Sequence, residues 1–275
     1  MTATPSPTVR VQCLARRHDV TARSSRVIPE ETPVAFTYGG STHAVMMATP
    51  ADLEDFALGF ALTEGLIDRI EESGEIEIIA SEAGIELRAW LSGGRQEAYA
   101  SRRRSMAGPT GCGLCGVESL EAATRPLPQI DNRLAIRAEA LIEAMERLPS
   151  GQKYNQETRA VHAAGFWHPA TGAMIVREDV GRHNALDKLA GALLRQGVTA
   201  SQGVVLMTSR VSVELVQKAA RIGAPVIAAV SAPTALAVRN AEICGMTLIA
   251  VMRGRDFEVF THPERLLEQV AAHVA

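Results

Sequence analysis

The chain has few cysteines, and its four, Cys13, Cys112, Cys115 and Cys244, are scattered over 275 residues. So sparse a set does not form the dense disulfide framework of a small secreted domain. No apolar run approaches the roughly 20 residues of a membrane-spanning helix. Residues 1–10 lack the apolar core of a secretory signal. We therefore expect a cytoplasmic protein without a membrane segment, in which the thiols stay reduced.

The chain also lacks a strong excess of either charge, since its formal net charge is −3. A balance this close to neutral gives no whole-chain signature of nucleic-acid binding, so we expect no nucleic-acid partner. Hydrophobic residues make up 47% of the chain and charged residues 21%. These values are typical of a globular protein with a large core, in one large domain or two modest ones.

The N-terminal part has short alternating strands and one amphipathic helix. Thr49 is a plausible N-cap for this helix, which Gly65 can terminate. Expected strands are 33–37, 42–48, 75–80 and 85–91, with a possible further strand at 96–100. The sequence therefore predicts a flexible tail over residues 1–25 and a small α+β domain over residues 26–128.

The C-terminal part alternates apolar strands with helices of moderate length. Expected helices cover 136–148, 183–196, 212–222 and 233–244, with another starting at Pro263. Expected strands cover 159–167, 173–177, 203–208, 225–230, 246–252 and 257–261. Alternation of this kind favours an α/β domain over residues 129–275, with a largely parallel sheet flanked by helices.

Polar loops follow three of these strands. They contain Arg210, Ser231 and the run Arg253-Gly254-Arg255-Asp256. Ligands usually bind at the carboxyl ends of parallel strands, and a helix start and arginines both suit phosphate. The sequence lacks the glycine spacing of a Rossmann turn or a P-loop. The prediction of phosphate binding therefore depends on the three loops taken together.

The long loop 101–128 contains the most reactive pattern in the chain. Cys112 and Cys115 stand among three glycines, and the arginines at 102–104 precede them. Nearby arginines favour thiolate over thiol, and glycines favour a mobile loop, so we expect a reactive dithiol. A structural zinc site, a thioredoxin-like exchange pair and two ordinary buried cysteines are the alternatives. Zinc would need two further ligands that the sequence does not offer nearby.

Two other polar features have competing interpretations. His162 lies in an apolar strand and fits a hydrogen-bonded core histidine better than a ligand. The run 178–184 places two carboxylates, an arginine, a histidine and an amide at a strand-to-helix junction. Either Asp179 caps a solvated helix start, or the run forms a ligand site.

Taken together, the motifs resemble those of the FdhD family, the accessory sulfurtransferases of formate dehydrogenase. The matching stretches are 31–34, 55–60, 63–65, 111–116, 177–188, 216–220, 230–234 and 261–263. Two places depart from the pattern. The family often has Thr-Gly-Gly where this chain has Thr158-Arg159-Ala160, and Ser-Gly-Arg where it has Thr208-Ser209-Arg210. These departures affect the expected shape of the binding pocket more than the resemblance to the family.

The resemblance implies a cytidine deaminase-like mixed sheet for residues 129–275, without deaminase activity. The chain lacks the deaminase pattern, because His162 is followed by two alanines and the cysteine pair lies upstream. Family members take persulfide sulfur from a cysteine desulfurase and pass it to the molybdenum bis-guanine-dinucleotide cofactor of formate dehydrogenase. Cys112 is then the expected persulfide bearer, and Cys115 assists or resolves.

The expected cofactor-binding residues are Val251, Met252, Arg253, Gly254, Arg255, Asp256, Arg210, Ser231 and His183. The cofactor is a bound substrate, and no tightly held metal is expected. Expected partners are the desulfurase, the formate dehydrogenase catalytic subunit and a second copy in a homodimer. The rival hypotheses are a cofactor-binding chaperone that moves no sulfur and a zinc-binding structural protein.

Overall fold

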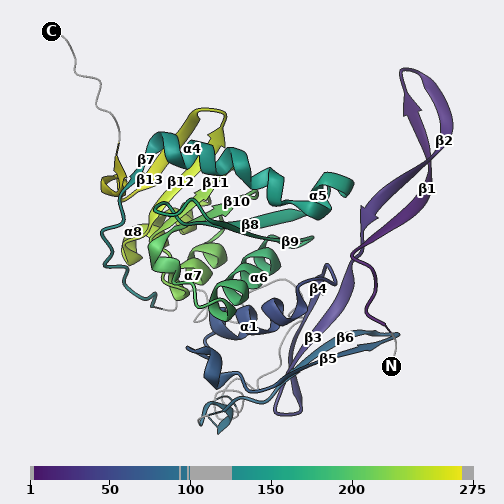
Figure 1. Ribbon diagram of the computed structural model, residues 1–275, viewed down its shortest axis with the longest axis horizontal. Coiled ribbons are helices and arrows are strands. Elements are labelled where there is room, and N and C mark those ends of the chain that lie inside the picture. The colour runs from purple at the N-terminus through teal and green to yellow at the C-terminus, as the bar shows by residue number, and fades with distance from the viewer. Residues whose placement is uncertain (1–2, 93, 98, 100–125, 268–275) are drawn as a thin grey trace. The chain divides into compact units, whose positions relative to one another are not determined.

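The computed structural model describes residues 3–92, 94–97, 99 and 126–267 (Figure 1). The chain divides into two compact units. The first comprises Met1–Pro126, Gln152–Ala163 and Arg177–Val198, and the second Leu127–Gly151, Ala164–Val176 and Thr199–Ala275. This differs from the expected division at residues 128 and 129, because two later segments return to the first unit. A single boundary in the sequence cannot represent a chain that returns twice to the first unit.

The first unit contains two sheets. Strands β1 (Thr8–Arg17) and β2 (Val20–Pro29) form an antiparallel ribbon. The other sheet has the order β4-β3-β6-β5, from β3 (Thr32–Tyr38), β4 (Ser41–Ala48), β5 (Ile76–Ser81) and β6 (Gly84–Ala89). The four strands predicted here are confirmed. The flexible tail predicted for residues 1–25 is wrong, since most of that segment is strand; its many arginines and serines hid the alternation.

The helices of this unit whose bounds lie wholly within the described residues include α1 (Leu53–Thr63), α5 (Lys153–Thr158) and α6 (Arg182–Arg195). Helices α1 and α6 cross where Gly59 meets Gly191. A Cβ atom on Gly59 would lie 1.7 Å from the Asp187 carbonyl oxygen, and one on Gly191 would lie 1.8 Å from that of Asp55. Only glycine permits backbones to approach this closely.

Two smaller sequence predictions for this unit are wrong, and one short element was not predicted. Thr49 does not cap α1, because Asp52 is its N-cap residue. The possible strand 96–100 is helical at residues 95–97 and 99. A 3₁₀ turn at Ile70–Glu72 precedes β5 and was not expected.

The second unit is built on a six-stranded sheet of order β13-β12-β11-β10-β8-β9. Its strands are β8 (His162–Trp167), β9 (Met174–Asp179), β10 (Val204–Met207), β11 (Val226–Ala229), β12 (Thr247–Arg253) and β13 (Asp256–Thr261). Strands β10, β11 and β12 run parallel, whereas β8 and β13 pair antiparallel to their neighbours. The sheet is therefore mixed, and the expectation of a largely parallel sheet holds only for its centre.

Helices cover both faces of this sheet (Figure 1): α4 (Ala138–Arg147) on one, α7 (Val213–Arg221) and α8 (Ala235–Cys244) on the other. Short pieces complete the unit: β7 (Ile136–Arg137), β14 (Leu266–Leu267) and 3₁₀ turns at Leu148–Gly151, Ala200–Gln202 and Pro263–Arg265. The helix expected from Pro263 is thus a single turn followed by a strand.

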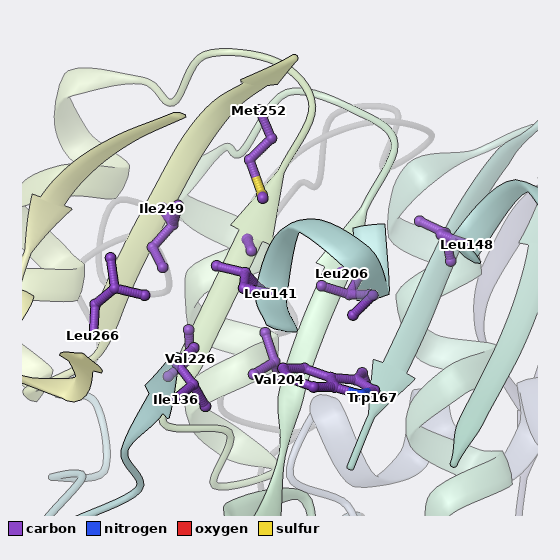
Figure 2. Close-up of a cluster of buried hydrophobic side chains, with 12 residues drawn as sticks. Ile136, Leu141, Leu148, Trp167, Val204, Leu206, Val226, Ile249, Met252 and Leu266 are labelled. Atoms are coloured by element: carbon purple, nitrogen blue, oxygen red, sulfur yellow. The ribbon is translucent and has the colours of Figure 1, made fainter. Parts of the chain in front are cut away.

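One hydrophobic core cluster of this unit lies between α4 and the sheet. Figure 2 shows Leu141 of α4 lying over the strands that carry Val204 and Ile249. All three side chains are fully buried. Burying each aliphatic side chain stabilises the folded state by roughly 1.5–3 kcal/mol. This packing holds in place the strands whose carboxyl ends form the polar edge described next. None of the helices in the described residues is long and apolar enough to cross a membrane.

Candidate functional site

The carboxyl ends of three neighbouring parallel strands share one edge of the six-stranded sheet. Arg210 follows β10, Ser231 follows β11, and β12 ends at Arg253. Since β10, β11 and β12 are adjacent and parallel, the three loops leave the sheet on the same side. The structure thus brings together polar residues that lie at least 21 positions apart in the sequence.

Backbone hydrogen bonds tie the first two of these loops together. The Val230 N–H donates to the Met207 carbonyl oxygen at 3.0 Å, and the Thr234 N–H donates to that of Val211 at 2.9 Å. Val211 also forms a parallel bridge with Pro233. The loops that carry Arg210 and Ser231 are therefore one rigid structure, with the Arg210 side chain exposed and Ser231 half-buried.

Helix α8 begins directly behind Ser231. Its N-cap is Thr234, whose hydroxyl oxygen accepts the Ala237 N–H at 3.3 Å. The other N–H groups of the first turn have no partner within the helix, and the helix dipole gives this end a partial positive charge. An anion such as a phosphate fits this position.

The turn between β12 and β13 completes the edge. Gly254 and Arg255 form a two-residue turn in which Gly254 has φ 58°, and Arg253 pairs with Asp256. Just before it, the pairing register shifts and Val251 has φ 56°. Positive φ is an outlier for a β-branched residue, and such strain of about 1–3 kcal/mol is concentrated at functional sites.

The chemistry of this edge suits a nucleotide. Arg210, Arg253 and Arg255 are exposed and available for charge-assisted hydrogen bonds to phosphate oxygens. The Asp256 carboxylate, also exposed, can accept hydrogen bonds from a donor edge such as that of a guanine base. Met252 is buried below the turn and anchors it. Eight of the nine expected cofactor-binding residues therefore lie at one edge of one unit.

His183 is the exception. It lies in the first turn of α6, half-buried, and belongs to the first unit. Its role in cofactor binding stays a prediction.

The cysteine pair Cys112 and Cys115 and the arginine run 102–104 lie outside the described residues. The other two cysteines are described. Cys13 is exposed on β1, whereas Cys244 is fully buried at the end of α8. Burial raises the pKa of the Cys244 thiol, so it stays protonated and unreactive.

Within the run 178–184, Asp179 neither caps a solvated helix start nor has an open position for a ligand, because the N-cap of α6 is Gly181. The Asp179 carboxylate is fully buried and accepts four hydrogen bonds. The Thr49 N–H at 3.0 Å and Lys188 Nζ at 2.6 Å bind one oxygen. The Gly181 N–H at 2.8 Å and Asn184 Nδ2 at 2.9 Å bind the other. With its four acceptor positions occupied, this carboxylate has none left for a ligand.

Glu178 has a related structural role. It accepts the N–H groups of Tyr154 and Asn155, both at 2.8 Å, at the start of α5. Burial raises the pKa of this carboxyl, and the two amide donors oppose that shift. The carboxylate thus supplies the cap that the sequence of α5 itself lacks.

His162 is half-buried at the start of β8. Burial lowers its pKa first, and the positive charge of Arg182 lowers it further. The side chain is therefore neutral at physiological pH, as expected for a core histidine.

Sequence reasoning missed Lys188 as a structural residue. Its ammonium group has no exposed surface, donates to the Thr49 carbonyl oxygen at 2.8 Å, and lies 5.3 Å from the centre of the Phe56 ring. A lysine on the apolar face of a predicted helix is the signal that could have found it, because lysine is almost never buried unless paired.

The comparisons with known proteins agree over nearly the whole chain. The family model described as FdhD/NarQ family matches residues 29–267. The Agrobacterium fabrum protein named sulfur carrier protein FdhD is 52% identical over 259 residues, with 94% of this chain and 96% of that protein covered. The relative of the same name from Brucella abortus is 50% identical over the same shares.

A solved structure is similar as well. A crystal structure from Desulfotalea psychrophila, described as a formate dehydrogenase accessory protein, aligns with a TM-score of 0.74 at 25% identity. The alignment covers 94% of this chain and 99% of that one. The described arrangement of sheets and helices is therefore shared along the length of both chains.

Proposed function

This chain belongs to the FdhD/NarQ family, and from that membership we propose that it carries sulfur for the maturation of a formate dehydrogenase. The observation that carries the proposal is the relationship at about 50% identity to proteins named sulfur carrier, over nearly the whole chain. The presence of a CxxC pair at positions 112 and 115 supplies the chemistry that this role requires.

The proposed reaction is a persulfide transfer at Cys112. Its thiolate attacks the outer sulfur of a persulfide on a cysteine desulfurase. One S–S bond forms, the other breaks, and the desulfurase thiolate leaves, so no external oxidant is needed. Cys115 assists this transfer or resolves the new persulfide. The arginines at 102–104 favour the thiolate form.

The proposed acceptor is the molybdenum bis-guanine-dinucleotide cofactor, bound as a substrate. The strained segment that ends at Arg253, the turn at Gly254 and the start of α8 support this role, because they present cations and free N–H groups at one sheet edge. The guanine nucleotide arms are the part of the cofactor that this edge suits. The fold of the second unit is proposed to be of the cytidine deaminase type.

The proposed partners follow from the same chemistry. A cysteine desulfurase supplies the sulfur, and the catalytic subunit of formate dehydrogenase receives the completed cofactor. We place this exchange in the cytoplasm and the protein in a homodimer.

A mass measurement tests the transfer. After incubation with a cysteine desulfurase and cysteine, the intact protein should gain about 32 Da on Cys112. Cys112→Ala should abolish the gain, whereas the matched variant Cys13→Ala should keep it. A protein that gains no sulfur in its unaltered form, or a Cys112→Ala variant that still activates formate dehydrogenase, contradicts the proposal.

The rival roles predict other outcomes. A cofactor-binding chaperone would activate formate dehydrogenase without any sulfur adduct. A structural zinc protein would contain stoichiometric zinc on metal analysis. Among the described residues, no group of three or more histidine, cysteine or acidic side chains could hold a metal ion.

A further inference from the structure

Helix α1 covers one face of the four-stranded sheet in the first unit. On β3, the Phe36 ring lies 3.9 Å from the Phe60 ring of this helix and 4.9 Å from its Phe56 ring, measured between ring centroids. Successive side chains along a strand point to opposite faces, so Ala35 belongs to the other face, which we call the outer face. Strand pairing assigns these further side chains to it: Pro33, Val45, Met47, Glu77, Glu86 and Arg88.

Large apolar side chains are exposed on the outer face. Val45 and Met47 are each 38% exposed. Trp90 directly follows β6, continues its alternation on the side of Arg88, and is 53% exposed. Among the described residues, the first unit exposes large apolar side chains only here and on the ribbon of β1 and β2. Exposed apolar surface of this kind marks interaction sites, and tryptophan is enriched among the residues that dominate binding energy.

A depression of about 300 Å³ lies on the outer face. Strand β3 contributes Pro33 and Ala35 to its lining, β4 contributes Val45, and the other two strands contribute Ser81 and Glu86. Because the side chains of β3 at this place are small, the longer side chains of the neighbouring strands rise around them. Binding pockets for small molecules hold roughly 300–1,000 Å³, so this depression suits one inserted side chain better than a whole cofactor.

The strands beside the depression are acidic. Residues 70–87 contain six glutamates and no lysine, arginine or histidine. On the outer face, Arg88 pairs with Glu86 at 2.9 Å and with Glu77 at 3.4 Å. Two carboxylates and one guanidinium leave this group with a net charge of −1. An apolar depression with an acidic side therefore complements a partner surface in which a basic side chain stands among apolar ones.

The cysteine pair and the nucleotide edge belong to different units. Positions 112 and 115 lie in the sequence between Tyr99 and Pro126, which both belong to the first unit. The sheet edge proposed for the guanine nucleotide arms belongs to the second unit. A sulfur donor must reach Cys112, whereas the acceptor binds at the sheet edge. A docking surface on the first unit therefore suits the donor.

We propose that the outer face docks the protein that donates the persulfide, through a segment in which a lysine or arginine stands among apolar side chains. The aliphatic stem of that basic side chain lies over Ala35, and its charge is directed to Glu86. The apolar neighbours cover Val45 and Trp90. This docking rests on the proposed sulfur transfer, because only a sulfur donor needs to reach Cys112. A partner that dissociates after each transfer suits a weak interface, which salt weakens further.

Transfer kinetics test the surface. The rate at which the full-length protein gains about 32 Da is measured by intact mass, with a cysteine desulfurase and cysteine as the donor, over a range of concentrations of the full-length protein. Val45→Arg repels a basic partner, Trp90→Ala removes an apolar anchor, and Ala35→Phe fills the depression. Each change should raise KM about tenfold and leave kcat unchanged, because it weakens docking and not the exchange of sulfur.

Two matched variants separate charge from position. Val45→Glu removes the same apolar side chain as Val45→Arg but attracts a basic partner, so its KM should stay below that of Val45→Arg. Ile243→Arg introduces the same charge on α8 of the second unit, at a side chain that is 67% exposed, and should leave KM unchanged. Because Val45 and Trp90 are exposed, variants at these positions should keep the fold, and the urea midpoint of each variant verifies this.

Inorganic polysulfide separates docking from sulfur chemistry. The Cys112 thiolate attacks one sulfur of this small donor, and a shorter polysulfide leaves. The reaction needs no protein surface, so every variant should gain sulfur from polysulfide at the rate of the unaltered protein. Variants that lose the polysulfide reaction as well would have a damaged reactive centre, and their raised KM would then contradict a role in docking.

Further outcomes decide between the docking surface and the transfer itself. An unchanged KM in Val45→Arg, Trp90→Ala and Ala35→Phe would refute the docking surface, and a gain of sulfur by the same proteins would leave the proposed transfer intact. An unaltered protein that gains no sulfur from the desulfurase would refute the transfer, and the docking surface with it. A Val45→Arg variant that becomes monomeric in sedimentation while its KM stays unchanged would assign the outer face to a contact between copies of the chain instead.

Discussion

At the scale of single residues, the pair Asp179 and Lys188 shows how burial decides the value of an ion pair. Both side chains are fully buried and 2.6 Å apart. The pair Arg16 and Asp19 has the same separation, but its side chains are 70% and 90% exposed. Water screens the second pair and cannot reach the first. Although the two pairs have the same separation, breaking the buried pair should lower the stability of the protein more than breaking the exposed pair.

The change Asp179→Asn should therefore destabilise the protein by about 3–5 kcal/mol, because it leaves the Lys188 ammonium buried without a counter-charge. Asp19→Asn should cost less than about 1 kcal/mol. Urea denaturation of both variants measures the difference in the free energy of unfolding. Similar losses for the two variants would show that burial does not set the strength of these pairs.

His162 should make stability depend on pH. Burial and then Arg182 lower its pKa below the ordinary value of 6.5. Protonation therefore favours the unfolded chain, whose histidine has the higher pKa. The contribution of His162 to stability is complete above pH 6.5 and is lost as the pH falls through the lowered pKa of the folded state.

We expect the urea midpoint of the unaltered protein to fall more steeply below pH 6.5 than that of His162→Gln. The comparison cancels the acid sensitivity of the carboxylates, which both proteins share. Parallel curves for the two proteins would contradict the predicted role of this histidine.

At the scale of elements, the crossing of α1 and α6 decides how the first unit is held together. Gly59 and Gly191 face backbone atoms of the opposite helix, with no room for a methyl group. The residues around the crossing, Asp55 and Asp187, also place carboxylates there. Asp55 is bound by Arg177 at 2.6 Å, and Asp187 by the Thr63 hydroxyl at 2.6 Å.

Either Gly59→Ala or Gly191→Ala should destabilise the protein by about 3 kcal/mol or more, since the helices must separate to admit the new methyl group. The sign of the change in the free energy of unfolding is informative, because a glycine-to-alanine change in an exposed helix interior stabilises a protein by about 1 kcal/mol. Thermal or urea unfolding provides the measurement. A gain in stability from either variant would contradict the close crossing.

At the scale of the whole molecule, the sheet edge of the second unit is expected to give the protein affinity for guanine nucleotides. Arg253→Ala or Arg255→Ala should each weaken binding of GDP about tenfold, because each removes a charge-assisted hydrogen bond to phosphate. Arg239→Ala, an equal loss of charge at an exposed position of α8, should have little effect. Isothermal titration of the full-length protein with GDP measures all three.

The salt dependence of the same titration distinguishes binding at the edge from general attraction. Higher ionic strength should weaken GDP binding by the unaltered protein more than by the variant that lacks both Arg253 and Arg255. If all three alanine variants bind GDP equally, the nucleotide does not bind at this edge.

The sequence by itself determined the elements of the second unit from residue 203 to residue 261. Apolar runs such as 225–230 and the caps that bound them are local signals, and here no distant contact overrides them. It also determined that Arg210, Ser231 and Arg253 lie at one edge, since parallel neighbouring strands end together. The assignment of a role to Cys112 came from family resemblance, because spacing alone left the two thiols equivalent.

Only the tertiary structure decided the rest. The partners of Asp179 include Thr49, which lies 130 positions away, and no periodicity reports a contact over that distance. The ribbon of residues 8–29 was hidden because arginines interrupt its alternation. The positive φ of Val251 arises from a register shift between two strands and not from the residue itself. Each of these features depends on pairing between distant segments, and the energy of that pairing exists only once the chain has folded.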